Sequence, residues 1–71
     1  MTLDGLQFDM TAKVARLAEN NLSSKLIEMG LYPGKEVKVV FKAPFGDPIA
    51  VELDGYTLSL RKREAQLVEI A

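Results

Sequence analysis

The 71-residue sequence contains neither cysteine nor histidine. Disulfides are therefore excluded, and so are the usual zinc-binding sets, which leaves packing alone to stabilise the fold. No apolar run exceeds three residues, which excludes a membrane-spanning helix. The N-terminus also lacks the basic start and apolar stretch of a signal peptide. We therefore expect a cytoplasmic protein with no direct insertion into a membrane.

An excess of charge of one sign is also missing, because nine lysines and arginines stand against ten aspartates and glutamates. The net charge of −1 gives no general attraction to nucleic acids or anionic lipids. A composition of 48% hydrophobic and 27% charged residues is typical of a globular domain, and this length leaves room for one core. We predict a single domain over residues 1–71.

The side chains that most often act as general base or nucleophile are absent with histidine and cysteine. No glycine-rich phosphate-binding loop precedes a predicted helix, and the spacing suggests no carboxylate pair. Ser23, Ser24 and Ser59 have no candidate base nearby in sequence. The acidic residues are scattered over separate segments, which disfavours a metal site. We predict that the protein is not an enzyme and carries no cofactor and no metal site.

Two stretches in the first half of the chain have the pattern of strands. Partial alternation around a β-branched centre predicts the first strand over residues 11–17. Regular alternation predicts the second over residues 36–42. In this second strand the apolar face is expected to hold Val37, Val39 and Phe41, with lysines on the other face.

A short amphipathic helix is predicted between these strands. Its apolar face recurs at i, i+4 and i+7, at Leu22, Leu26 and Met29. Asn20 or Asn21 can cap its start. Gly30 can end it in the left-handed conformation, after which Leu31 folds back on the helix. Residues 32–35 then form a tight turn around Pro-Gly.

The second half of the chain contains the strongest signal for a hairpin. Asp54-Gly55 separates two alternating runs and predicts a two-residue type I′ turn. Pairing Leu53 with Tyr56 places the apolar residues of both strands on one face. A single helical turn is predicted over residues 61–65 and a last strand over 67–70. Five strands in so short a chain would leave exposed edges, so we predict a small barrel.

Three segments occur in order along the chain, KLIEMGLYPG at residues 25–34, APFGDP at 43–48 and GYTLSLR at 55–61. Together they resemble the FeoA family, and the resemblance spans nearly the whole chain. It implies a mainly β fold, a small five-stranded SH3-like barrel with one short inserted α-helix and a short helical turn before the last strand. The chain departs from the family at residues 7–10, QFDM, where members commonly have a Pro-Gly turn.

The resemblance also implies a function. Members of the FeoA family are small cytosolic proteins that accompany the FeoB ferrous iron transporter of bacteria. We therefore expect a non-enzymatic accessory that binds the cytosolic, GTP-hydrolysing part of FeoB and regulates or assembles the transporter. Because the chain offers few ligands that ferrous iron prefers, we expect it to act on the transporter rather than on the metal. Self-association is left open.

The loop at residues 43–48 is the expected centre of the partner-binding surface. Its prolines stiffen it, and a stiff loop that carries an aromatic residue is a good interface anchor. Phe45 could instead tuck over the barrel end as part of a structural bend. Our hypothesis is that Phe45 is exposed beside a cleft made by the helix end. The predicted partner-binding residues are Leu26, Met29, Leu31, Tyr32, Pro44, Phe45, Pro48 and Arg61.

The sequence leaves two alternatives open. The basic run at residues 61–63 could join Lys35, Lys38 and Lys42 in a nucleic-acid-binding barrel, although the ten acids and a pI near 5.3 argue against nucleic acid as a partner. The chain could also be a stand-alone relative of the SH3-like domain that ends iron-dependent repressors. It lacks the helix pair with which a repressor reads DNA.

Overall fold

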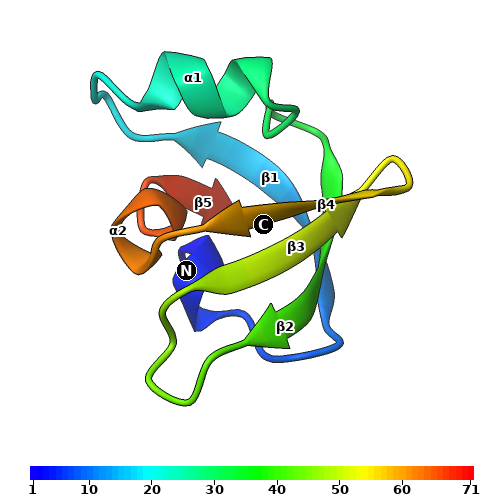
Figure 1. Ribbon diagram of the computed structural model, residues 1–71. Coiled ribbons are helices and arrows are strands. Elements are labelled where there is room, and N and C mark those ends of the chain that lie inside the picture. Colours follow the sequence, from blue (N-terminus) through cyan, green and yellow to red (C-terminus); the bar gives the residue numbers. More distant parts are fainter.

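The computed structural model describes all of residues 1–71, and it contains five antiparallel strands and two short helices (Figure 1). The strands lie in one sheet in the order β4-β3-β2-β1-β5. This arrangement confirms the predicted mainly β class, with the inserted helix and the helical turn before the last strand. In chain order the elements are η1 (a 3-10 turn, Leu3–Gly5), β1 (Thr11–Leu17), α1 (Ser23–Glu28), β2 (Glu36–Lys42), β3 (Ile49–Leu53), β4 (Tyr56–Leu60), α2 (Lys62–Ala65) and β5 (Val68–Ile70).

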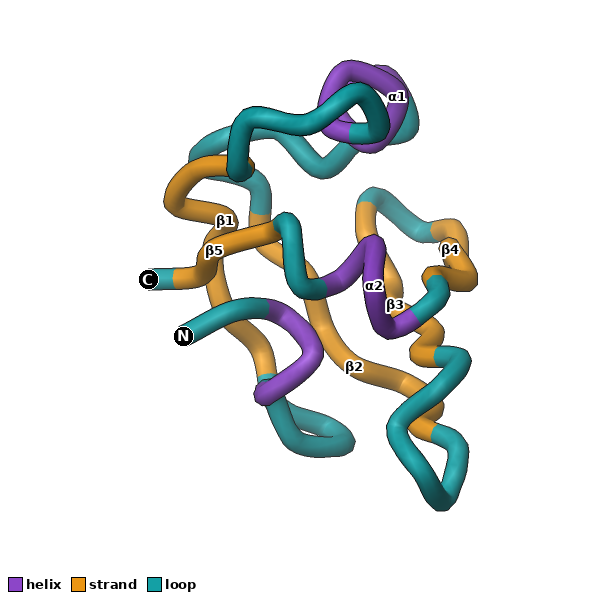
Figure 2. Tube along the Cα trace, turned by 90° about the vertical axis from the view of Figure 1, so that its left-hand side faces the viewer, coloured by secondary structure: helices purple, strands orange, loops and turns teal.

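The sheet curls around one core because β1 takes part in both halves of it. Its first part pairs with β2 and its second part with β5, and the register shifts between Val14 and Arg16. Such a bulge bends a strand and lets a sheet wrap. Fourteen buried hydrophobic residues, drawn from every element, form the core that the sheet encloses. α1 lies across one end of the curled sheet (Figures 1 and 2).

The end of α1 matches the prediction in detail. Gly30 takes a φ of 113°, the backbone N–H of Leu31 donates to the carbonyl of Leu26 at 3.0 Å, and that of Gly30 donates to Ile27 at 3.0 Å. This is the pair of bonds that defines a Schellman motif. The start differs, because the amide oxygen of Asn20 accepts from the N–H of Leu22 and closes a turn just before the helix.

The β3–β4 hairpin has the predicted register. Leu53 pairs with Tyr56 and Val51 with Leu58, and the pairing continues without interruption to the end of both strands. The two turn residues, Asp54-Gly55, have φ values of 50° and 80°. Positive φ at both positions is what a type I′ turn requires.

The prediction that Phe41 lies on the inward face of β2 is wrong. The pairing of β2 with β3 shifts register between Val39 and Phe41, so that Val40 is an extra residue. A bulge of this kind reverses the alternation that follows it. The side chain of Phe41 is therefore outside, with 52% of its surface exposed. Lys42 turns inward instead, and its Nζ donates to the carbonyl oxygens of Asp4 and Leu6 at 2.7 and 3.2 Å.

Residues 7–10 form a turn even though they lack the Pro-Gly pair. The N–H of Met10 donates to the carbonyl of Gln7 at 3.1 Å, and Asp9 has a φ of 70°. Aspartate tolerates the left-handed conformation better than most residues, so it can occupy this position. Backbone bonds between the turn and Val39 hold it beside β2.

The Schellman motif generates a test that separates backbone strain from packing. A Cβ atom on Gly30 would lie 2.8 Å from Cδ1 of Leu53 and would also overlap the hydroxyl of Tyr56, whereas one on Gly34 would meet nothing within 4 Å. Both glycines have positive φ. We expect Gly30→Ala to lower the free energy of unfolding by about 2–4 kcal/mol, and Gly34→Ala by about 1–2 kcal/mol. Urea denaturation measures both, and equal losses would show that the overlap at Gly30 is relieved without cost.

Candidate functional site

The predicted partner-binding residues near α1 do not form an exposed surface. Leu26 and Leu31 are fully buried in the core, and Met29 is only partly buried against it. Only Tyr32 is exposed, with 45% of its surface accessible. The physical reason is that the apolar stripe of so short a helix packs onto the core, and the Schellman motif folds Leu31 back under it. Leu26 and Leu31 therefore support the site from within and cannot contact a partner.

The loop at residues 43–48 lies at the opposite end of the molecule from α1. Both views show this separation, with the loop at the bottom of Figure 1 and of Figure 2 and α1 at the top. The structure therefore does not place Phe45 beside Leu31 and Tyr32, contrary to our expectation of one shared cleft. The predicted residues divide into a helix end and a loop end.

The loop is closed by its own backbone. The N–H of Ala43 donates to the carbonyl of Pro48 at 3.2 Å, and the N–H of Gly46 donates back to Ala43 at 2.7 Å. Gly46 has a φ of 78°, which glycine adopts without steric cost. Pro44 is exposed and Pro48 partly buried. The two bonds and two rings restrict the conformations that the loop can take.

Asp47 ties this loop to the start of α2. Its Oδ1 accepts a hydrogen bond from the backbone N–H of Lys62 at 3.1 Å and forms an ion pair with Nε of Arg61 at 3.2 Å. The second oxygen lies 3.4 Å from Nη2 of Arg61. The predicted residues Phe45, Pro48 and Arg61 thus belong to one local unit, in which Arg61 positions the loop.

Phe45 itself is exposed, as expected. Its residue surface is 92% accessible, the largest value among the large hydrophobic residues. The alternative in which its ring covers the barrel end is therefore wrong. An exposed aromatic ring on a closed loop has no packing role within the chain.

Sequence reasoning missed three more exposed apolar residues at this end. Phe8 has 64% of its surface exposed, and Met10 and Phe41 are each about half exposed. The backbone bonds between residues 9–10 and Val39 hold the first two beside β2, and both views place their turn at the end opposite α1. We define these residues, Phe8, Met10, Phe41 and Phe45, as the apolar end. The only signal for Phe8 was its place in a turn, and Phe41 was hidden by the bulge.

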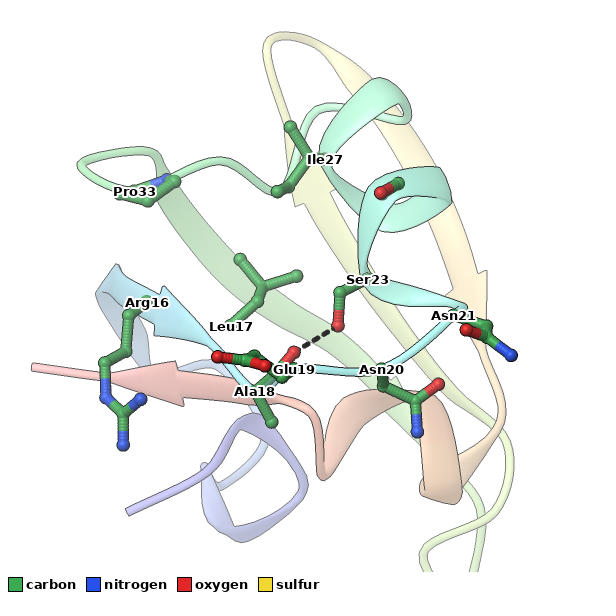
Figure 3. A pocket seen from close by; sticks show the side chains of 10 residues that line it. Arg16, Leu17, Ala18, Glu19, Asn20, Asn21, Ser23, Ile27 and Pro33 are labelled. Carbon is green, nitrogen blue, oxygen red and sulfur yellow. Dashed lines mark hydrogen bonds between the residues drawn. The ribbon is translucent and has the colours of Figure 1, made fainter.

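The helix end carries an open groove of a different character (Figure 3). It lies between the end of β1 and α1, and its lining is mostly polar, with the side chains of Leu17 and Ile27 extending into the same space. The hydroxyl of Ser23 donates to the carbonyl of Ala18, which gives this buried serine a structural role. No three carboxylates lie close enough together anywhere in the chain to hold a metal ion. Neither helix approaches the length needed to cross a bilayer.

One ion pair, between Lys35 and Asp54, raises the pKa of its lysine. Lys35 reaches across to Asp54 in the hairpin turn, and only 14% of its side chain is exposed. The hydrogen bond to the Asp54 carboxylate raises the pKa of the Lys35 ammonium above its ordinary value of 10.5, against a smaller opposing effect of desolvation. The pair joins the turn at residues 32–35 to the β3–β4 hairpin.

The direction of this pKa shift predicts how the pair contributes at different pH. Because the folded-state pKa is raised, the stabilisation should be fully present below about pH 10.5, the value of the unfolded chain. It should be lost as pH rises through the folded-state pKa. We expect the difference in melting temperature between wild type and Lys35→Met to be constant from pH 7 to 10 and to shrink above that range. A difference that grows with rising pH would contradict the assignment.

The exposure of Phe45 predicts that its ring contributes little to stability. Phe45→Ala removes no buried surface, so the free energy of unfolding should stay within about 0.5 kcal/mol of wild type. Leu31→Ala is the contrasting variant, because it empties a buried site and should cost about 2–5 kcal/mol. Chemical denaturation followed by circular dichroism measures both. A loss of several kcal/mol for Phe45→Ala would return its ring to the core.

Comparisons with known proteins identify relatives of the whole chain. The FeoA domain model matches residues 1–71. A Porphyromonas gingivalis protein, the Fe(2+) transport protein A/Fe(2+) transporter FeoB fusion protein, is 32% identical over 71 residues. That match takes in 99% of this chain, and the chain spans only 8% of the length of the fusion protein.

Two solved structures share the fold over the full chain. The FeoA-like protein of Clostridium acetobutylicum is 38% identical, with a TM-score of 0.91 over 100% of this chain and 84% of that one. The zinc complex of Stenotrophomonas maltophilia FeoA, described as a prokaryotic SH3 domain protein, is 30% identical. Its TM-score is 0.90, with 100% of this chain and 89% of that chain covered. These likenesses confirm the SH3-like fold.

Proposed function

Because the chain belongs to the FeoA family, we propose that it is a cytoplasmic accessory of a ferrous iron transporter and binds the cytosolic part of FeoB. Members of the family are transport accessory domains. The Porphyromonas gingivalis protein is named as a fusion of Fe(2+) transport protein A with the Fe(2+) transporter FeoB, which puts both in one polypeptide. Covalent linkage holds two modules at a high effective concentration, which suits partners that act together. This supports FeoB as the partner of the separate chain.

The observation that carries the binding proposal is the exposure of Phe45 on an anchored loop. An interface anchor is most effective when its backbone is already in the bound conformation, because less entropy is lost on binding. The backbone bonds within residues 43–48 and the Asp47 contacts to α2 supply this preorganisation. The other members of the apolar end enlarge the surface that a partner could cover.

Basic residues at the border of the loop suggest the charge of the partner surface. Lys62 and Arg63 are exposed beside the loop and form no ion pair within the chain. Arg61 is already paired with Asp47. A partner surface with an apolar pocket and an acidic rim would complement this arrangement. In this proposal the chain acts by contact alone, regulating or assembling the transporter without chemistry of its own.

Titration of the purified cytosolic domain of FeoB tests the proposal. Phe45→Ala should weaken binding about thirtyfold, which corresponds to about 2 kcal/mol, because the anchor is lost. Isothermal titration calorimetry gives the dissociation constants. Tyr32→Ala serves as the matched control, since it removes an exposed aromatic ring at the helix end.

Unchanged affinity for Phe45→Ala, together with a large loss for Tyr32→Ala, would move the interface to the helix end. Absence of binding by the wild-type protein at millimolar concentration would remove FeoB's cytosolic domain as the partner.

A further inference from the structure

The two edge strands of the sheet differ, because another segment of the chain covers only one of them. β5 is one edge, and the N-terminal segment covers it, since Thr2 bridges to Glu69 and the N–H of Ile70 donates to the carbonyl of Met1 at 2.9 Å. β4 is the other edge, and no further element lies beyond it (Figure 2). The second edge is therefore left without a backbone partner.

The hairpin register shows which groups of β4 are free. The closing pair of a two-residue hairpin exchanges both of its hydrogen bonds, and bonded and non-bonded pairs then alternate along the strands. Leu53–Tyr56 and Val51–Leu58 are bonded pairs, so the N–H and C=O groups of Thr57 and Ser59 point away from β3. No other backbone group in the chain bonds to them.

β4 also lacks the features with which natural proteins block an open edge. Residues 56–60, YTLSL, contain no charge and no proline. The side chains of Thr57 and Ser59 are small and exposed, and Leu58 is only partly buried. An uncharged strand of β-prone residues with free backbone groups is a template for pairing with another strand.

We propose that two copies of this chain associate by antiparallel pairing of their β4 strands, which joins two sheets across a two-fold axis. The pairing is self-complementary when Leu58 lies opposite Leu58 of the second copy. In that register Thr57 lies opposite Ser59 of the second copy, and each such pair exchanges two backbone hydrogen bonds. All four free positions on the two edges are then satisfied.

Charge at the ends of β4 favours this orientation. The strand is preceded by Asp54 in the hairpin turn and followed by Arg61 and Lys62. Antiparallel pairing brings the basic end of one copy to the acidic turn of the other, whereas parallel pairing would bring like charges together. Asp54 is 61% exposed despite its contact with Lys35, and Lys62 has no ion-pair partner in its own chain. A second copy therefore complements both the backbone and the charge of this edge.

The association should be weak and concentration dependent. A pair of short strands buries far less area than a stable dimer needs, so we expect a dissociation constant on the order of 0.1–1 mM. The apolar end is not used. Lys62 borders both proposed surfaces, so measurements on the chain alone separate this pairing from binding to FeoB.

Sedimentation velocity of the whole chain from about 20 µM to 2 mM, together with amide hydrogen exchange by NMR, tests the pairing. We expect the sedimentation coefficient to rise from the monomer value toward the dimer value over this range. The Thr57 and Ser59 amides should exchange more slowly as the dimer population increases. Ser59→Pro removes a donor that β3 does not use, so the hairpin should persist while dimerisation is lost. Ser59→Ala is its control, because it keeps the N–H and should dimerise as wild type.

A second pair of variants covers the case in which Ser59→Pro does not fold. Lys62→Glu should raise the dissociation constant about tenfold, because it places two carboxylates together at each end of the pair. Lys25→Glu makes the same charge change on α1, outside the paired strand and its turn, and should have no effect. A monomer at every concentration would overturn the proposal. So would a dimer in which the Thr57 and Ser59 amides still exchange rapidly.

Discussion

The extra residue Val40 in β2 is the constraint on which the loop end of this protein depends. By shifting the register against β3, it turns Phe41 to the outside and Lys42 to the inside. An inward lysine is acceptable there because the carbonyls of Asp4 and Leu6 receive its ammonium group. The same contact ties the N-terminal turn to the end of β2, so one local irregularity both exposes an aromatic residue and fixes the segment beside it.

The two ends of the barrel consequently differ in construction. At the helix end, Leu26 and Leu31 point inward while Ile27 and Tyr32 are partly exposed. The groove between β1 and α1 there is mostly polar, and the Ser23 hydroxyl donates to the carbonyl of Ala18 beside it. At the loop end, apolar side chains point outward from segments that are themselves well anchored. Exposed apolar surface without a partner is a cost to a small protein, and the three most exposed aromatic residues, Phe45, Phe8 and Phe41, all lie at the loop end. This is the physical reason for proposing the transporter contact there.

Local signals predicted most of the fold and only part of the site. The type I′ turn and the alternation around it set the hairpin register together, and Gly30 set the end of α1, because each depends on neighbours in sequence. The bulge could not be predicted, since alternation at Val39 and Phe41 looks regular until β3 is paired. The separation of Phe45 from Tyr32 depends on how the sheet curls, which no local pattern records. The stiffness of the loop predicted that Phe45 is an exposed anchor. No comparable local signal marked Phe8.

In the proposed complex the transporter contacts the loop end of the barrel. NMR of the labelled protein with unlabelled cytosolic domain of FeoB tests it most directly, because every backbone amide reports its own environment. We expect chemical-shift changes and line broadening to concentrate in residues 8–10, 41–47 and 61–63. Perturbation concentrated instead in residues 16–33, around α1 and its groove, would contradict it.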